Sequence, residues 1–561
     1  MHRDALPMPE PTDPMSISRF TAGSLWARLR PGWAAVALLA ILATAAYLRL
    51  RGISWGLPYS FQNADESLMV EKGFSMARGN VNPGWFYYPS FFFAMLGALY
   101  WFTGLVLHGA AAASFVAPGA LVLDPTPFFL SARLLVATCG VVSVYLLYRI
   151  GTEGYSRSVG LLAALFLAVT PLHVRYSHVA VTDVPAVTLG LLALLFFVRA
   201  TQRRSGRALF AGALAAGLAT STKYNLGMLV LPAAVAAWYA CGDPARRRGV
   251  LSFTRHLASR VAMPMAIAFL VGSPFALLDL PHFLRDLSAQ NRIVADGWLG
   301  FERVDSGYWY NLAVNLPSSL GLVLVLLGMA GLVLAAASRR RVDFVLVPYV
   351  VVYYLYVSSW AELMDRYLLP IVPLLIVLAV RACVMLAGTT VVRRRVATFA
   401  TAFSVVAVLA VAFVLPLQAS IRYADALQGV DVRTVAKSWV ERHITSGAVI
   451  AAEPYGPPLV SRVDLHLYRE AGHRPAAYRI VQLKLPLPQK PDRCRTFAYL
   501  DRRGVRYVIV SSQVYERVLA ATDVYPIEVR FYRALAARAT LLKTFSPGAG
   551  ESGPVIKIYE L

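Results

Sequence analysis

Residues 33 to 48, WAAVALLAILATAAYL, form an apolar run that contains no charged side chain. A helix needs about 20 mostly apolar residues to cross the hydrocarbon core of a bilayer. Similar runs start near residues 91, 128, 159, 183, 207, 226, 260, 313, 344, 367 and 396. Of the 561 residues, 57% are hydrophobic and 15% are charged, and the mean hydropathy is +0.56. A soluble fold could not bury this much apolar surface, so the sequence predicts an α-helical polytopic membrane protein.

The basic residues indicate the topology. The chain has a net charge of +23 and a pI near 10, but its arginines stand in short clusters between the apolar runs. Such clusters are typical of the cytoplasmic loops of membrane proteins, and we expect no nucleic-acid partner. The clusters lie at residues 28–30, 149–157, 199–207, 246–260, 339–341 and 393–395. Residues 1–32 lack a convincing small-residue cleavage site and are interpreted as a cytoplasmic tail.

The positions of the arginine clusters exclude one of the candidate crossings. If every run before residue 149 crossed the membrane, the arginines of 149–157 would lie outside. The run at 89–108 begins in the aromatic stretch Trp85-Phe86-Tyr87-Tyr88-Pro89, which is typical of a membrane interface. It is predicted to be a juxtamembrane or re-entrant helix. About eleven crossings remain, and they place all of the arginine clusters inside. Arg49 and Arg51, just outside the first crossing, oppose this topology.

Three domains follow from this pattern: the tail 1–32, a transmembrane domain 33–418 with outer loops 51–127 and 279–312, and an outer domain 419–561. The last segment has mixed charge, and predicts a small α/β domain with strands at 448–451, 507–510 and 555–558 and helices near 431–445 and 525–538. We expect a multi-pass protein of the inner cell membrane, with a cytoplasmic N-terminus and an extracytoplasmic C-terminal domain. Its four cysteines show no disulfide or metal spacing.

Two acidic residues in the first outer loop are candidates for chemistry. Asp65 and Glu66 follow Asn63 and precede a helical pattern that ends at Arg78-Gly79. A capped first helical turn explains acids at these positions, because the helix dipole stabilises them. The alternative is that one carboxylate acts as a general base on an acceptor hydroxyl, which is a poor nucleophile at neutral pH.

A second polar group is predicted at the outer end of the third crossing. His173, Arg175 and His178 precede Thr182-Asp183-Val184-Pro185. Thr182 could cap the next helix, and Pro185 is tolerated in its first turn. Capping does not explain the histidines and the arginine, which could hold a sugar, a phosphate or a metal. The spacing is a weak metal signature, and no metal or other cofactor is predicted, although a divalent ion stays possible.

Two cations complete the candidate site. Lys223 lies in a tight turn between two crossings, where it could be a snorkelling interfacial lysine or a phosphate ligand. Arg366 stands beside Tyr367, and could bind phosphate or simply be neutralised by Glu362 and Asp365. The segment from Asp279 to Tyr310 mixes charged and aromatic residues and is interpreted as an interfacial loop or lid.

These motifs together resemble the type-C membrane glycosyltransferases of family 39, the branch that contains protein mannosyltransferases and the bacterial aminoarabinose transferases. The resemblance covers roughly residues 33 to 385. It is carried by Asp65-Glu66, Tyr88-Pro89, Arg133-Leu134, Thr182-Asp183-Val184-Pro185, Thr222-Lys223 and Arg366-Tyr367 with Pro370.

The resemblance implies a polyprenyl-phosphate-linked monosaccharide donor, an extracytoplasmic acceptor and inversion by single displacement. It makes Asp65 the catalytic base, with Glu66 and Asp183 in support. Many relatives have Lys-Pro-Pro-Leu where this chain has Tyr88-Pro89-Ser90-Phe91, so Lys223 and Arg366 are expected to bind the phosphate, with Tyr88, Arg175, His178 and Tyr367 as further substrate-binding residues. The alternatives are a transporter or lipid flippase, or a silent scaffold.

Overall fold

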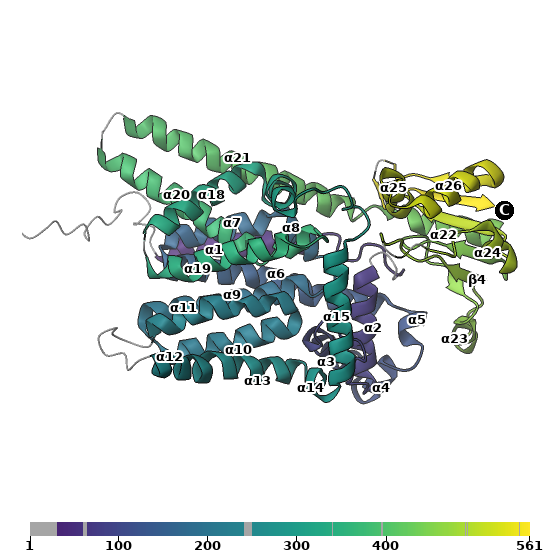
Figure 1. Cartoon of the computed structure of the whole chain (residues 1–561), viewed down its shortest axis with the longest axis horizontal. Helices are drawn as coiled ribbons and strands as arrows, with labels where there is room; N and C mark the ends of the chain where they lie inside the picture. Colours follow the sequence, from purple (N-terminus) through teal and green to yellow (C-terminus); the bar gives the residue numbers. More distant parts are fainter. Residues whose placement is uncertain are drawn as a thin grey trace, which may run out of the picture.

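The computed structural model describes residues 31–59, 64–240, 250–338, 340–393, 397–488, 490, 492–548 and 550–561. A long helical bundle carries a smaller domain of strands and short helices at one end (Figure 1). Several residues used above lie outside the described ranges: most of the tail 1–32 with Arg28 and Arg30, the capping Asn63, the cluster Arg246 to Arg248, and Arg339, Arg394 and Arg395.

Every apolar run predicted to cross the membrane falls on a helix of the bundle. Leu, Ala and Val dominate these segments, and a helix satisfies its own backbone polar groups, as an apolar solvent requires. Their bounds are α1 Pro31–Leu50, α6 Thr126–Gly154, α7 Arg157–Val169, α9 Asp183–Arg203, α10 Gly206–Thr222, α11 Val230–Ala240, α12 Val250–Leu257, α13 Met263–Gly272, α18 Leu322–Ser338, α19 Arg341–Ser358, α20 Val372–Arg393 and α21 Ala397–Ala426.

By length and composition alone, six of the described helices could cross a membrane, or seven when the bent pair Gly307–Leu320 and Leu322–Ser338 counts as one. The total of eleven crossings therefore stays a prediction. The segment Phe91–Phe115 passes the same test, and its assignment as a juxtamembrane helix is not settled by length. Its first part, α3 Phe91–His108, packs closely on α2 Ala64–Ala77, because Gly73 admits the Leu96 side chain.

The two arginines that opposed the predicted topology are held by protein groups. Arg49 is fully buried, and its guanidinium donates to the carbonyls of Ala168 at 3.0 Å and Leu167 at 3.3 Å, at the end of α7. A cation at a helix C-terminus is favourable because the carbonyls there have no helical partner. Arg51 pairs with Asp425 of α21 at 2.5 Å. Neither needs a cytoplasmic location.

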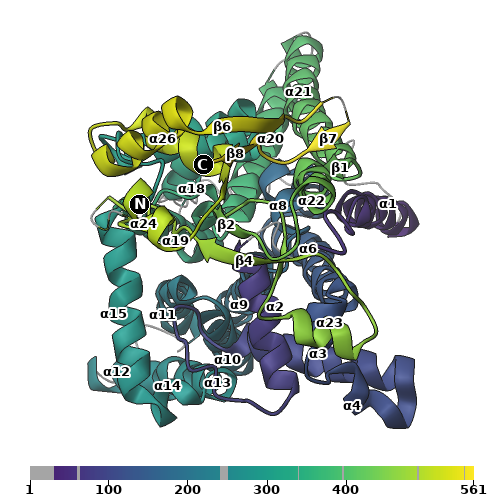
Figure 2. The ribbon, with the colours of Figure 1, turned by 90° about the vertical axis from the view of Figure 1, so that its right-hand side faces the viewer.

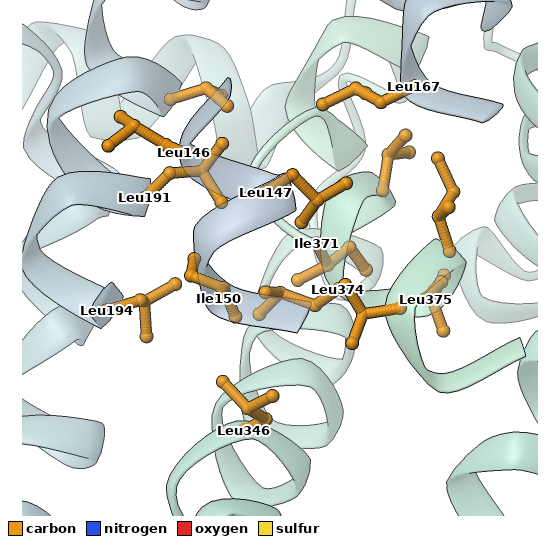
Figure 3. Close-up of a cluster of buried hydrophobic side chains, with 14 of the residues drawn as sticks. Leu146, Leu147, Ile150, Leu167, Leu191, Leu194, Leu346, Ile371, Leu374 and Leu375 are labelled. Carbon is orange, nitrogen blue, oxygen red and sulfur yellow. The ribbon is translucent and has the colours of Figure 1, made fainter. Parts of the chain in front are cut away.

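The centre of the bundle is a leucine-rich core (Figure 3). Side chains from α6, α7, α9 and α19 meet residues at the start of α20, and they are Leu146, Leu147, Ile150, Leu167, Leu191, Leu194, Leu346, Ile371, Leu374 and Leu375. Helices α6 and α7 pack closely at Gly151 and Gly160, where a Cβ on Gly151 would lie 2.7 Å from the Gly160 Cα. This packing fixes the helix ends that carry the polar residues described below.

The C-terminal domain is an α/β unit built on a mixed sheet of six strands, in the order β3-β4-β2-β5-β8-β6. Strands β2, β4 and β5 are parallel, and β8 is antiparallel to both β5 and β6. The strands are β2 Val449–Ala452, β3 Val460–Ser461, β4 Ala477–Gln482, β5 Tyr507–Ser511, β6 Thr540–Phe545 and β8 Ile556–Glu560, and a separate pair joins β1 Val430–Asp431 to β7 Glu551–Ser552.

The predicted strands correspond to β2, β5 and β8, and the predicted helices to α22 Val432–His443 and α26 Pro526–Arg538. Strands β4 and β6 and the helices α23 Leu465–Glu470, α24 Phe497–Arg502 and α25 Ser512–Ala520 were not expected. The boundary expected at 418 falls inside α21, which continues to Ala426. Between domain and bundle, α2 and α15 Leu280–Asp296 run across the bundle end (Figures 1 and 2).

Candidate active site

Three helix ends and one short helix bring the candidate residues to the bundle end that carries the C-terminal domain. Asp65 and Glu66 lie in the first turn of α2, and Asp183 is the first residue of α9. Lys223 is the C-cap of α10. Arg366 and Tyr367 belong to the short helix η7 Asp365–Leu368, between α19 and α20.

Two ion pairs form the centre of the site. Arg366 Nη1 lies 2.5 Å from Asp65 Oδ2, and Lys223 Nζ lies 2.5 Å from Asp183 Oδ1. The second pair is buried, whereas the Asp65 side chain is 38% exposed. Charge-assisted hydrogen bonds of this kind are strong when water is excluded. The first pair can be reached by a substrate, and the second is a fixed part of the site.

Tyr367 connects the two pairs. Its ring centroid lies 5.0 Å from Lys223 Nζ and 5.7 Å from Arg366 Cζ. A cation within about 6 Å of an aromatic face is attracted by the ring quadrupole, so the buried tyrosine interacts with both cations. The charge of Arg366 also acts on Lys223, so the two ion pairs form one electrostatic group.

Several buried polar atoms around these pairs have no hydrogen-bond partner among the described residues. They include Arg366 Nε, Arg175 Nε and Thr182 Oγ1. Thr182 occupies the N-cap position of α9, but its side chain makes no capping bond, so the expected capping role is wrong. A buried donor without a partner costs free energy, and such atoms at a site are ready to bind a polar ligand.

Glu362 is a third carboxylate of the site, and the only role predicted for it from the sequence was to neutralise Arg366. It is buried and hydrogen-bonded to Tyr367, and the charges of Asp65, Lys223 and Arg366 act on it. Burial raises its pKa. Glu362 is far from Asp65 and Lys223 in the sequence, so its place beside them could not be predicted. Its spacing to Arg366 was the one feature of the sequence that indicated it.

Tyr88, in the segment before α3, belongs to the same group of charged and polar side chains. Burial raises the pKa of its phenol, and the charges of Arg366, Asp65 and Asp183 act on it. The indole of Trp85 stacks on its ring at 5.8 Å between centroids. The tyrosine therefore belongs to the same electrostatic group as these three charged residues.

Exposure separates the two adjacent acids of α2. Glu66 is fully buried and receives two bonds from Arg133, at 2.7 Å from Nε and 2.8 Å from Nη2. It also accepts from the Ala180 amide at 2.8 Å. Arg133 in turn donates to the Ile53 and Trp55 carbonyls. Glu66 thus fastens α2 to α6 and to the loop before α9, and its place favours a positioning role over proton transfer.

The segment between α7 and α9 is fastened in the same way. Arg175 pairs with Asp365, next to Arg366, and Tyr176 donates to Asp365 at 3.0 Å. His178 is buried, with Nδ1 2.9 Å from the Val174 carbonyl and Nε2 3.0 Å from the Arg51 carbonyl. With both nitrogens against backbone oxygens, His178 is positioned for packing, and its geometry argues against the substrate-binding role expected from the sequence.

Residues 128–271 match a family model described as dolichyl-phosphate-mannose-protein mannosyltransferase. Asp183 and Lys223 lie within the match. The fold is similar to the oligosaccharyltransferase of Archaeoglobus fulgidus in its apo form, with 13% identity, a TM-score of 0.54, and coverage of 94% of this chain and 75% of that one. It is also similar to ArnT from Cupriavidus metallidurans bound to undecaprenyl phosphate, with 14% identity, a TM-score of 0.51 and coverage of 94% and 98%. No curated protein sequence matches the chain.

The fold is that of the type-C membrane glycosyltransferases, and a quarter of the chain matches the mannosyltransferase family model. The resemblance inferred from the sequence is confirmed at this level, and so is the α-helical membrane fold with a small C-terminal domain that contains strands. In the described residues, no group of three His, Cys, Asp or Glu side chains has the arrangement of a metal site. Asp65 and Asp183 each pair with a cation of the chain itself.

Proposed function

We propose that the enzyme transfers one monosaccharide, with inversion, from a polyprenyl phosphate to a hydroxyl acceptor outside the cytoplasm. The observation that carries the proposal is that two cations, Arg366 and Lys223, contact the same Tyr367 ring, with Arg366 Nε buried and without a partner among the described residues. The mannosyltransferase description of the family model and the undecaprenyl phosphate bound by the similar ArnT support this donor class.

The reaction needs a leaving group, a nucleophile and a base. The bond between the sugar C1 and the phosphate oxygen breaks, and the electron pair leaves with the phosphate, whose added charge Arg366 and Lys223 stabilise. A bond forms between C1 and the acceptor oxygen from the opposite face. The acceptor proton passes to Asp65, the exposed one of the two acids in α2.

The remaining residues position these groups. Asp183 holds the Lys223 ammonium, and the Tyr367 ring contacts both cations. Tyr88 and the Thr182 hydroxyl are placed to bind the sugar or the phosphate, and Glu362 to hold Tyr367. We assign Glu66 and Arg175 to positioning, and we do not assign His178 to substrate binding.

The test uses the purified full chain in detergent with undecaprenyl-phosphate mannose and an extract of the cell envelope. The proposal expects loss of the donor and appearance of undecaprenyl phosphate together with a mannosylated product. A protein that moves the lipid across a liposome bilayer without cleaving it would be the transporter or flippase of the alternative. Reporter fusions at each terminus test the proposed sidedness, with the N-terminus cytoplasmic and the C-terminal domain outside.

A further inference from the structure

The loop that leads into η7 is held at both of its ends by one helical segment. The loop runs from Ser358, the last residue of α19, to Leu363, shortly before η7. The segment comprises α16 Gly307–Tyr310, η6 Asn311–Asn315 and α17 Leu316–Leu320, which follow one another directly. The contacts to the two ends of the loop come from the first and the last residue of η6.

These two asparagines form a buried chain of hydrogen bonds. Asn315 donates to the Leu363 carbonyl at 2.9 Å and to Asn311 Oδ1 at 2.7 Å. Asn311 in turn donates to Ser358 Oγ at 2.9 Å. A side-chain amide group has two hydrogens to donate, and Asn315 uses both of them here. Both asparagines are buried, so the chain closes the loop from Ser358 to Leu363 without competition from water.

The stability of their own helix does not explain the two asparagines. Asparagine is a weak helix former, because its amide competes with the backbone for hydrogen bonds. Pro317 has no N–H to donate to the Ala313 carbonyl, and its ring crowds that oxygen. This crowding favours the wide π-turn that η6 adopts. Such turns inside helices are frequent at functional sites.

Backbone contacts hold the same loop between its ends and at its start. The Ala361 amide donates to the Val294 carbonyl of α15 at 2.9 Å. Gly307 packs on the end of α19, where a Cβ on it would lie 2.4 Å from the Ser358 carbonyl oxygen. Together with the asparagine chain, these contacts fix the loop at Ser358, Ala361 and Leu363.

The position of the loop determines the position of the site arginine. Arg366 is the second residue of η7 and follows Leu363 by three positions. A helix of one turn is not stable by itself, so the contacts at its ends set its direction. At one end Asp365 pairs with Arg175, and at the other Asn315 holds the Leu363 carbonyl. A shift of that carbonyl therefore moves Arg366 away from its place.

We propose that Asn315 is a positioning residue for Arg366, and thereby for the phosphate of the lipid donor. This role rests on the proposed function. A guanidinium binds phosphate oxygens through a planar fork of fixed geometry. A displacement of about 1 Å in such a group is enough to weaken the contact. Asn315 acts through Leu363 and the loop, not by contact with the reacting atoms.

The test uses the full chain in detergent and measures its dissociation constant for undecaprenyl phosphate. It also measures the half-saturating concentrations of undecaprenyl-phosphate mannose and of a cell-envelope extract as acceptor. Asn315→Ala should raise the two lipid constants about fivefold and the acceptor concentration by less than about twofold. Ser358→Ala removes one hydroxyl at the far end of the chain, so it is the milder variant. It should raise the lipid constants about twofold.

A double-mutant cycle separates positioning from a general loss of structure. In an Arg366→Met background, Asn315→Ala should change the lipid affinity by less than about twofold, because the residue through which it acts is gone. Ser319→Ala is the matched control. Ser319 is buried in α17, and its hydroxyl donates to the Asn315 carbonyl of its own helix, so its loss should leave all three constants unchanged.

Three results would overturn the inference and leave the proposed function standing. They are wild-type lipid affinity in Asn315→Ala, an equal loss of affinity in the Arg366→Met background, and the same loss in Ser319→Ala. If Asn315→Ala does not fold, wild-type lipid affinity in Ser358→Ala overturns it. If wild type consumes no donor and binds no undecaprenyl phosphate, the proposed function fails, and the role of Asn315 fails with it.

Discussion

Arg366 and Asp65, 301 residues apart in the sequence, form an ion pair with 2.5 Å between Nη1 and Oδ2. In the proposed reaction the same arginine must bind the donor phosphate while the carboxylate accepts a proton. When a phosphate binds Arg366 and draws it away from Asp65, the carboxylate oxygen that was bonded to Arg366 becomes free to accept the proton of the acceptor. This arrangement favours an order in which the donor binds first and thereby prepares the base.

Asp65→Asn should lower the rate of transfer by about 10²- to 10⁴-fold, since an amide cannot accept the proton. Binding of undecaprenyl phosphate, measured as the rise in unfolding temperature, should persist because Arg366 and Lys223 remain. Asp305→Asn, an exposed acid of the outer loop, is the control and should transfer at the wild-type rate. Full activity in the Asp65 variant, at wild-type expression, would remove Asp65 from the mechanism.

Arg366→Lys tests the phosphate contact. Lysine keeps the charge but lacks the planar fork that binds two phosphate oxygens at once, so the dissociation constant for undecaprenyl phosphate should rise about tenfold. Arg303→Lys is the comparison, because Arg303 forms an exposed pair with Asp523 at the surface. Unchanged lipid affinity in Arg366→Lys would show that the guanidinium geometry is not used.

Glu66→Ala should destabilise the fold more than it affects the chemistry. The buried Arg133 would lose both of its bonds to the carboxylate, and an uncompensated buried charge costs about 3–5 kcal/mol. Thermal unfolding in detergent measures the effect. The double variant Glu66→Gln with Arg133→Met removes the charges together and should recover part of the loss; a double variant as unstable as Glu66→Ala would contradict this account.

The sequence predicted the membrane fold well because arginines cluster at one end of the crossings and apolar runs have a fixed length. It could not predict that Arg49 caps α7 or that Arg51 pairs with Asp425, because both partners lie far along the chain. The motifs predicted the helix around Asp65 and the two cations of the site. They did not show which of Asp65 and Glu66 is exposed. That choice depends on Arg133, which only the fold brings to Glu66.

One residue of the site carried almost no signal. Glu362 stands four residues before Arg366 and suggested surface neutralisation, whereas the fold buries it and bonds it to Tyr367.

Glu362 should make stability depend on pH. Burial raises its pKa, so the folded protein holds this proton more tightly than the unfolded chain, whose glutamate pKa is about 4.3. The stability that protonated Glu362 contributes is fully present below the pKa of the unfolded chain. It is lost as the pH rises through the pKa of the folded protein. The unfolding temperature of Glu362→Gln, minus that of wild type, should therefore increase between pH 5 and pH 7.5. A difference that decreases with pH would mean that the pairing with Arg366 outweighs burial.

Leu299 should hold the outer loop on the C-terminal domain. It is 1% exposed and belongs to the domain's hydrophobic cluster although it comes from the segment after α15. Truncation of a buried leucine costs about 2–5 kcal/mol, so Leu299→Ala should open this contact and speed proteolytic cleavage within residues 297–306 by about 30-fold or more. Leu284→Ala, an exposed leucine on α15, should cleave at the wild-type rate. If both variants are cleaved equally, the loop is held by Glu302 and Arg303 alone, and the hydrophobic anchor is not needed.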